Sequence, residues 1–472
     1  MQRTKMIFTI GPASDSKSIL RQLMEIGMNV TRLNFSHGTH ADHKIKMDII
    51  KELREELNKS IAIMLDIKGP KIRTHNFIGD TVELDKGQKF VFSCGKEILG
   101  NKERCSVSYK ELCHDLKVNG RLLVDDGLIE FKIDSIEGTE INCTALNSGF
   151  IGNHKGINVP NISIGLPAVT DKDKLDLIFG CEQGVDIVAA SFIRKASDVI
   201  DVRNILNANG GEHIQIISKI ETQEGVDNID AIIEASDGIM VARGDMGVEL
   251  PIEKVPIIQK MIIHKCNKSG KPVITATQML DSMIRNPRPT RAEASDITNA
   301  IFDGTDAIML SGESANGKYP LEAALTMAKI AIEAESNIDF RDALIKKIYE
   351  PLDNISDAIS LATCTTADKL NVSAILTATQ SGYTARMVSK YRPRCPVIAV
   401  TPSKQVARGL AINFGVQSIL SIKLTSTDEL MADAVGKSLA AGYIKKGDIV
   451  IIAAGIPVGE PGTTNMMKIQ QV

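Results

Sequence analysis

The sequence predicts an α/β protein built on a (β/α)₈ barrel, with a small β-barrel-like cap inserted into the barrel and an α/β domain after it. Short β-branched runs alternate with long amphipathic stretches through most of the chain, as parallel strands alternate with crossover helices. This alternation is interrupted once, after the third run, and a second α/β pattern begins after about residue 345. The 472 residues suffice for about three domains of roughly 150 residues each.

Eight β-branched runs are the predicted barrel strands. They cover residues 5–10, 29–36, 61–68, 185–192, 214–221, 238–245, 272–279 and 306–313. Helical periodicity is found in residues 14–27, 41–59, 197–210, 253–270 and 320–336. Because the runs are almost continuously apolar, they suit strands covered on both faces, and eight such units favour a closed barrel over an open doubly wound sheet.

The insertion after the third strand has β character. Residues 81–93 and 127–146 alternate polar and apolar side chains, with Gly and Asn at the turns, which indicates antiparallel strands. We expect a β-rich cap over the barrel mouth. The predicted domains are the barrel (1–69 and 169–345), the cap (70–168) and a carboxyl-terminal α/β domain (346–472). The strands expected in that last domain are 374–380, 396–402, 417–422 and 448–455.

Composition argues against several classes of protein. A net charge of −3 provides no bulk attraction to nucleic acid or to a membrane surface. The apolar run near the amino terminus is too short for a signal peptide, and no stretch approaches the roughly 20 apolar residues of a spanning helix, so we expect a cytoplasmic protein. The eight cysteines are scattered without a C-x-x-C pair, which predicts free thiols rather than a zinc site or disulfides.

Polar residues gather at the carboxyl ends of six predicted strands, where barrels of this kind carry their chemistry. These residues are Arg32, Asn34, Ser36, Asp66, Lys68, Lys219, Glu221, Arg243, Asp245, Thr275, Thr277, Ser311 and Glu313. Any one of them alone would be read as a helix cap, a surface ion pair or an ordinary strand residue. Their coincidence on one rim predicts a site.

The chemistry of that rim suits phosphoryl transfer. Lys219 and Glu221 lie two apart on one strand, so their side chains point the same way. Glu221 and Asp245 on neighbouring strands can hold Mg²⁺, which takes one or two carboxylates and leaves its other positions to water and substrate. Together with Arg32 and Arg73, these groups suit a polyanion whose phosphoryl group is being moved.

Eight segments of the chain together resemble the pyruvate kinase family. They are TIGPAS (9–14), TRLNFSHG (31–38), LDIKGPKIRT (65–74), ISKIE (217–221), VARGDMGVELP (241–251), ATQMLDSM (276–283), RPTRAEASD (288–296) and MLSGESANGKYP (309–320). The resemblance implies a barrel A domain, a B cap and a C domain. It also implies a cytoplasmic glycolytic enzyme, often a homotetramer, that moves a phosphoryl group from phosphoenolpyruvate to ADP with Mg²⁺ or Mn²⁺, giving pyruvate and ATP.

The resemblance also assigns roles to residues of the rim and the cap. Lys219, Thr277 and Arg32 match catalytic residues, with Lys219 stabilising the phosphoryl group in transfer and Thr277 tied to protonation of the enolate. Expected substrate contacts are Arg32, Lys219, Gly244, Asp245 and Thr277. Expected nucleotide contacts are Asn34, His37, Arg73 and Lys155. Glu221 and Asp245 match the divalent-metal ligands.

One segment departs from the pattern common in the family. Asn34, Ser36 and Asp66 match the monovalent-cation site, but Ile67 stands where many members have threonine and Lys71 where they have glutamate. An ammonium on Lys71 can provide the fixed positive charge that K⁺ would supply. We therefore predict activity without K⁺. Two alternatives remain: the site still binds some K⁺, or Lys71 is simply a solvated charge in a loop.

The carboxyl-terminal domain contains a candidate effector site. Its residues Thr377, Thr379, Ser381, Gly382 and Thr384 lie between an apolar strand and a helix, where backbone N–H groups can bind phosphate. Helix capping alone would also explain them. The resemblance implies a sugar-phosphate or AMP effector, or none. We also expect that the additional carboxyl-terminal domain found in some bacterial members of the family is missing.

Two other functions are also compatible with the sequence. One is another Mg²⁺-dependent barrel enzyme acting on phosphoenolpyruvate or an oxo acid, such as a lyase or a dikinase. A dikinase needs a phosphorylatable histidine, and none of the eight histidines lies in a convincing loop. The other is a catalytically silent sensor of a sugar phosphate. Against it stands the complete set Arg32, Lys219, Glu221, Asp245 and Thr277, of which a silent relative should have lost a member.

Overall fold

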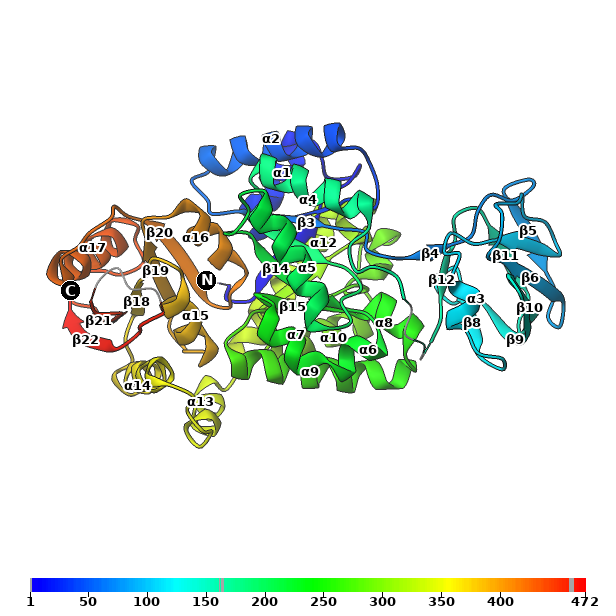
Figure 1. The fold of residues 1–472 in the computed structure, drawn as a ribbon. Coiled ribbons are helices and arrows are strands. Elements are labelled where there is room, and N and C mark those ends of the chain that lie inside the picture. Colours follow the sequence, from blue (N-terminus) through cyan, green and yellow to red (C-terminus); the bar gives the residue numbers. More distant parts are fainter. Residues whose placement is uncertain (1, 161, 163–164, 458–461) are drawn as a thin grey trace.

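The computed structural model describes all residues except 1, 161, 163–164 and 458–461. Three bodies lie in a row, with the barrel between the cap and the carboxyl-terminal domain (Figure 1). The barrel closes in the strand order β1-β17-β16-β15-β14-β13-β3-β2, which confirms the predicted fold class. Its strands are β1 (Lys5–Thr9), β2 (Met28–Asn34), β3 (Ala62–Asp66), β13 (Ile187–Ala190), β14 (Gln215–Ile220), β15 (Gly238–Ala242), β16 (Val273–Ala276) and β17 (Ala307–Leu310).

Helices surround these strands. They are α1 (Lys17–Ile26), α2 (His40–Glu56), α4 (Asp171–Gln183), α5 (Ala196–Ala208), α6 (Gln223–Asp227), α7 (Ile229–Ala235), α8 (Arg243–Glu249), α9 (Val255–Ser269), α10 (Arg291–Asp303), α11 (Gly312–Ala315) and α12 (Pro320–Ser336). The five expected helices are present. The expectations omitted α4 and α10, although both begin at a capping box, Thr170 with Asp173 and Thr290 with Glu293, which is a local signal of a helix start.

All eight predicted barrel strands are too long at their carboxyl ends, five by one or two residues and three by three residues. The predicted strand 238–245 ends at Ala242, and the chain turns directly into α8. The predicted strand 272–279 ends at Ala276, because Thr277 and Gln278 adopt left-handed backbone angles, φ 68° and 55°. The predicted strand 306–313 ends at Leu310, just before α11. Asp245 and Thr277 are therefore presented by a helix turn and by a strained turn rather than by strands.

The interior of the barrel is layered. Alternate strand residues point inward, and the central layer is apolar, with Ile7, Val30, Met64, Ile217 and Met240 all fully buried. The inward-pointing residues near the carboxyl ends of the strands are charged, and they lie in the barrel mouth under the cap. The opposite mouth is closed by the short 3₁₀ helix η3 (Leu410–Ile412) of the carboxyl-terminal domain, whose residues 411 and 412 belong to the same buried cluster.

The cap consists of a seven-stranded sheet in the order β4-β12-β8-β9-β10-β6-β7 and a two-stranded sheet of β5 and β11. Its elements are β4 (Ile72–Arg73), β5 (Thr81–Leu84), β6 (Lys89–Ser93), β7 (Arg104–Ser106), α3 (Leu112–Asp115), β8 (Arg121–Val124), β9 (Ile129–Glu137), β10 (Glu140–Ala145), β11 (Gly149–Gly152) and β12 (Gly156–Asn158). The chain enters the cap through β4 and returns through β12, and these two strands pair with each other. They form the hinge between cap and barrel (Figure 1).

The carboxyl-terminal domain has a five-stranded sheet in the order β20-β19-β18-β21-β22. Its elements are α13 (Phe340–Ile348), α14 (Ile355–Leu370), β18 (Ala374–Ala378), α15 (Tyr383–Lys390), β19 (Val397–Thr401), α16 (Lys404–Gly409), β20 (Val416–Leu420), α17 (Thr427–Ala440), β21 (Ile449–Ala454) and β22 (Met466–Gln471). The four expected strands are present. The expectations omitted β22, which pairs antiparallel with β21.

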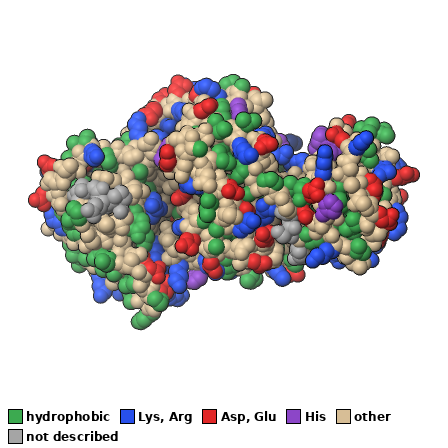
Figure 2. All heavy atoms as spheres, in the orientation of Figure 1, with side chains coloured by type: hydrophobic (Ala, Val, Ile, Leu, Met, Phe, Trp, Pro, Cys, Tyr) green, Lys and Arg blue, Asp and Glu red, His purple; other side chains and the backbone are tan. Residues whose placement is uncertain are grey.

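The surface and the thiols agree with the composition. All eight cysteines are free. Acidic and basic side chains are interspersed on the face shown in Figure 2. Within the described ranges, no helix has both the length and the apolar character needed to cross a membrane.

Buried charges join the barrel to the carboxyl-terminal domain. Asp306 Oδ1 accepts hydrogen bonds from Arg392 Nη1 at 2.8 Å and from the backbone N–H of Phe414 at 3.0 Å. Lys5, which is 2% exposed, donates from Nζ to the carbonyl oxygen of Val416 at 2.6 Å. Burial lowers the pKa of Lys5 to about 8, although Glu335 and Asp306 favour its charged form.

We expect the contribution of Lys5 to stability to increase as the pH rises from 8 to 10. The unfolded chain holds this proton up to its ordinary pKa of 10.5 and the folded protein only to about 8, so the unfolded state binds more protons in this window. The difference in unfolding free energy between the wild type and Lys5→Met should grow by about 2 kcal/mol over this range. Denaturant titrations at pH 8, 9 and 10 measure it, and a difference independent of pH would contradict it.

Candidate active site

A buried ion cluster occupies the barrel mouth beneath the cap. Asp66, at the end of β3, accepts from Arg32 Nε at 2.6 Å and from Lys219 Nζ at 3.3 Å. Asp66 is 1% exposed, Lys219 8% and Arg32 9%. Burial opposes ionisation of Asp66, but Arg32 and Lys219 hold its pKa below the ordinary value. One carboxylate thus pairs with two cations that would otherwise be costly to bury.

Lys219 is fixed from three sides. Besides Asp66, its Nζ donates to Ser191 Oγ at 2.7 Å and lies 3.1 Å from Glu221 Oε1. Burial alone would lower the pKa of Lys219, but Asp66 and Glu221 raise it above the ordinary value. The side chain is therefore a rigid, permanently charged ammonium, which suits a group that stabilises developing negative charge.

Glu221 and Asp245 are the candidate metal ligands. Glu221 is fully buried; its Oε2 accepts from the backbone N–H of Phe192 at 2.6 Å, while Oε1 faces the Lys219 ammonium at 3.1 Å. Burial, aided by the nearby Asp245 carboxylate, raises the pKa of Glu221 to about 7 although Lys219 favours ionisation. The described residues contain no group of three or more metal-ligating side chains. Two neighbouring carboxylates fit an ion that completes its shell with water and substrate oxygens.

Thr277 and Gly244 are held together on the rim. The backbone N–H of Gly244 donates to Thr277 Oγ1 at 2.7 Å, and that hydroxyl donates to the carbonyl of Ala276 at 2.6 Å. Arg243 does not face the site, because its guanidinium binds Asp296 at 2.7 Å and the carbonyl of Thr277 at 2.8 Å. These bonds hold Thr277 in a backbone conformation that is unfavourable for a β-branched residue.

Lys71 lies at the hinge and reaches the barrel. Its Nζ is 3.3 Å from Asp245 Oδ1 and 3.1 Å from Asp126 Oδ1 of the cap. Burial opposes its charge, but Asp245 and Asp126 raise the pKa of Lys71 above the ordinary value. Among the described hydrogen bonds and ion pairs, none joins Lys71 to Asn34 or Ser36.

The remaining monovalent-site and nucleotide residues divide between barrel and cap. Asn34 accepts from the backbone N–H of Ser36 at 3.1 Å, and Ile67 is 1% exposed. Asn34 and His37 line one pocket with Thr9, Ile10 and Gly11. Within the cap, Arg73 donates to the carbonyl of His154 at 2.7 Å, and Lys155 lies 2.8 Å from Asp125.

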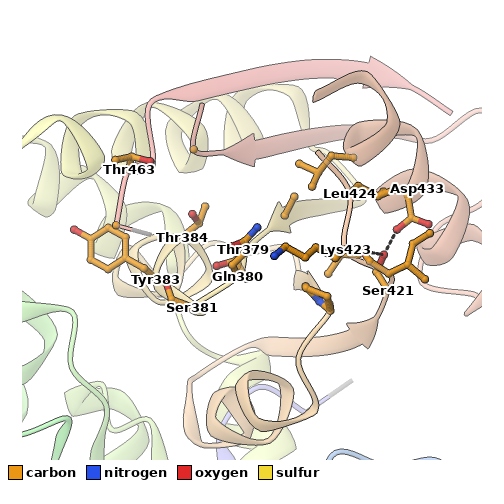
Figure 3. A pocket seen from close by; sticks show the side chains of 17 residues that line it. Thr379, Gln380, Ser381, Tyr383, Thr384, Ser421, Lys423, Leu424, Asp433 and Thr463 are labelled. Atoms are coloured by element: carbon orange, nitrogen blue, oxygen red, sulfur yellow. Dashed lines mark hydrogen bonds between the residues drawn. The ribbon is translucent and has the colours of Figure 1, made fainter. Parts of the chain in front are cut away.

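Three of the five candidate effector residues line a pocket of the carboxyl-terminal domain (Figure 3). Thr379, Ser381 and Thr384 line it, and Gly382 precedes α15 with φ 79°. Thr377 does not line it, since its hydroxyl is buried and donates to the carbonyl of Ile398 at 3.4 Å.

Sequence reasoning missed four polar residues of these sites. Ser191 contacts Lys219, Thr9 accepts from Arg32 Nη1 at 2.9 Å, and Asp126 pairs with Lys71. Lys423 extends across the effector pocket towards Gln380 (Figure 3). Ser191 and Thr9 lie at the ends of predicted strands, so the rule that found the other rim residues could have found them. Asp126 and Lys423 lie in loops without such a signal.

The barrel and the charged mouth under its cap define a phosphotransferase. Residues 1–324 match the family model described as "Pyruvate kinase, barrel domain", and residues 357–470 match "Pyruvate kinase, alpha/beta domain". This chain therefore belongs to the pyruvate kinase family. The curated pyruvate kinases of Clostridium acetobutylicum and Clostridium perfringens are 62% and 59% identical to it, with 100% of each chain covered.

A solved structure agrees with this assignment. A pyruvate kinase from Cryptosporidium parvum superposes with a TM-score of 0.94 at 39% identity, covering 100% of this chain and 96% of that one. The silent-sensor and lyase alternatives are set aside, since the full-length relatives are named as kinases.

We expect Asp66→Asn to destabilise the barrel by about 3 kcal/mol, because Arg32 and Lys219 would be left buried without their shared counterion. Asp48→Asn is the matched control, since Asp48 pairs with Lys44 on the surface and both side chains are about half exposed. That control should change stability by less than about 0.5 kcal/mol. Chemical denaturation of both variants measures the difference, and equal effects would contradict the importance of Asp66.

Proposed function

We propose that this enzyme transfers the phosphoryl group of phosphoenolpyruvate to ADP, with a divalent ion and without a requirement for K⁺. The observation that carries the proposal is the buried Lys219 ammonium, held charged between Asp66 and Glu221. A fixed cation at the mouth of a barrel, next to two carboxylates that suit Mg²⁺, is the arrangement that stabilises a phosphoryl group in transfer.

Each residue of the barrel mouth has its own role in the proposed reaction. Lys219 neutralises the oxygens of the moving phosphoryl group and, after transfer, the enolate oxygen. Arg32 binds the substrate phosphate; its Nε is committed to Asp66 and its Nη1 to Thr9, so its guanidinium is presented in a fixed orientation. Gly244 and Thr277, which are hydrogen-bonded to each other, would contact the substrate carboxylate, and the Thr277 hydroxyl would relay the proton that converts enolate to pyruvate.

Glu221 and Asp245 would hold Mg²⁺ or Mn²⁺. When bound, the ion supplies charge neutralisation and orients donor and acceptor oxygens. Because burial raises the pKa of Glu221 and a metal ligand must be deprotonated, protons would compete with the ion for this carboxylate as the pH falls.

The nucleotide would lie between barrel and cap. Asn34 and His37 contribute from the barrel pocket, and Arg73 and Lys155 contribute from the cap. Both cap cations now pair with cap groups, so each must exchange that partner for a phosphate oxygen when the nucleotide binds.

Further parts of the proposal concern regulation and assembly. Thr379, Ser381, Gly382 and Thr384, with Lys423, would bind a sugar phosphate or AMP, while Thr377 supports the loop from below. A homotetramer and a cytoplasmic location follow from the family resemblance alone.

We expect Lys219→Met to reduce turnover at least a thousandfold, since a rigid ammonium aimed at developing charge contributes roughly this much. Coupled assays of pyruvate formation measure it, and circular dichroism and Mn²⁺ binding test that fold and metal site survive. Lys265→Met is the matched control, because Lys265 pairs with the exposed Asp230 on the barrel surface. More than a tenth of wild-type turnover in Lys219→Met would refute the assigned role.

We expect pyruvate and ATP to form from phosphoenolpyruvate, ADP and Mg²⁺ in a K⁺-free Tris buffer at a rate close to that with K⁺ added. The physical reason is the ammonium of Lys71, a built-in monovalent charge at the edge of the site. Activity that appears only when K⁺ is added would leave the phosphotransfer intact and disprove the role of Lys71.

A further inference from the structure

Lys71 is the one cap-side cation that reaches a candidate metal ligand among the described ion pairs. Its Nζ lies 3.3 Å from Asp245 Oδ1, and its side chain is only 15% exposed. The same nitrogen lies 3.1 Å from Asp126 Oδ1, which belongs to the loop between β8 and β9. A single ammonium therefore joins a carboxylate of the barrel to a carboxylate of the cap.

The packing around Lys71 shows that this position is built into the hinge. A Cβ on Gly156 would lie 2.5 Å from Lys71 Cε, so the lysine stem passes where β12 has no side chain. The neighbouring residues Ile72 and Ile157 pair across the hinge strands. The returning strand is also fixed to α8, because Asn158 Nδ2 donates to Glu249 Oε1 at 2.7 Å. Since α8 also carries Asp245, the bond between Asn158 and Glu249 helps to keep the Lys71 ammonium close to the Asp245 carboxylate.

A divalent ion and this ammonium would compete for one carboxylate. Two cations that share a carboxylate oxygen at about 3 Å repel each other strongly in a partly buried site. We propose that Lys71 is the resident counterion of Asp245 in the metal-free protein, and that the divalent ion displaces it from this carboxylate. This inference rests on the proposed function, which places the ion at Glu221 and Asp245.

The exchange links metal binding to the cap. In the metal-free protein Lys71 ties cap to barrel through Asp126 and Asp245. Once the ion takes Asp245, Lys71 keeps its bond to Asp126 and moves with the cap. The released ammonium is then available to face substrate oxygens, which is the role proposed above for a built-in monovalent charge.

The first test measures Mn²⁺ affinity without substrates, by electron paramagnetic resonance of free Mn²⁺. Removing the competitor in Lys71→Met should tighten Mn²⁺ binding by about tenfold, within the usual range of coupling between two sites. Lys89→Met is the matched control, because Lys89 is an exposed cap lysine that pairs with Asp134 at 2.9 Å. It should bind Mn²⁺ as the wild type does.

The second test uses the wild-type protein and separates displacement from simple loss of charge. Acetic anhydride labelling followed by mass spectrometry compares Lys71 with Lys89, with and without Mg²⁺. The Lys71 side chain is only 15% exposed while it contacts Asp245, so its release would make the amine more accessible to the reagent. We therefore expect Mg²⁺ to raise labelling of Lys71 severalfold and to leave Lys89 unchanged.

The outcomes separate the two proposals. Tighter Mn²⁺ binding in Lys71→Met together with Mg²⁺-dependent labelling of Lys71 supports the displacement. Equal Mn²⁺ affinity in the variant and the wild type, or Lys71 labelling that ignores Mg²⁺, overturns it while the metal site stands. Failure of the wild type to bind Mn²⁺ at all overturns the metal site and the displacement together.

Discussion

The pairing of Asp66 with both Arg32 and Lys219 is the interaction on which the barrel mouth depends. Three ionised side chains lie in the top layer of the barrel, directly above an apolar layer. A cation there without a carboxylate would lose its charge or the layer would open to water. Because the buried cations have carboxylate partners, Lys219 stays charged while buried. The mouth can therefore attract a polyanion although the protein surface is not basic.

The two candidate metal carboxylates differ in what surrounds them, and this difference divides their roles. Glu221 is buried, receives a backbone N–H and faces Lys219. Asp245 is about one-third exposed and faces Lys71 from the hinge. The buried ligand is thus fixed within the barrel, whereas the exposed one lies at the boundary with the cap. Any ion held by both would lie at the boundary between barrel and cap.

The sequence predicted the strands, the inward alternation and most of the rim, because period-two patterns and strand order determine these features. Arg32, Asp66 and Lys219 were expected together and are found together. The sequence did not predict that Asp245 lies on a helix or that Thr277 lies in a left-handed turn, since both begin where the repeating pattern stops. The contact of Lys71 with Asp126, 55 positions away, depends on the path of the hinge, which leaves no periodic signal.

The insertion of residues 411 and 412 into the lower barrel mouth affects the order in which the domains can fold during translation. The cap closes its sheets with strands from one continuous segment, so it can fold soon after its residues leave the ribosome. The barrel cannot complete its interior in this way, because part of that interior is synthesised late, in the carboxyl-terminal domain. The domain that begins first during translation is therefore finished only when nearly the whole chain is present, and its apolar lower mouth stays uncovered until then.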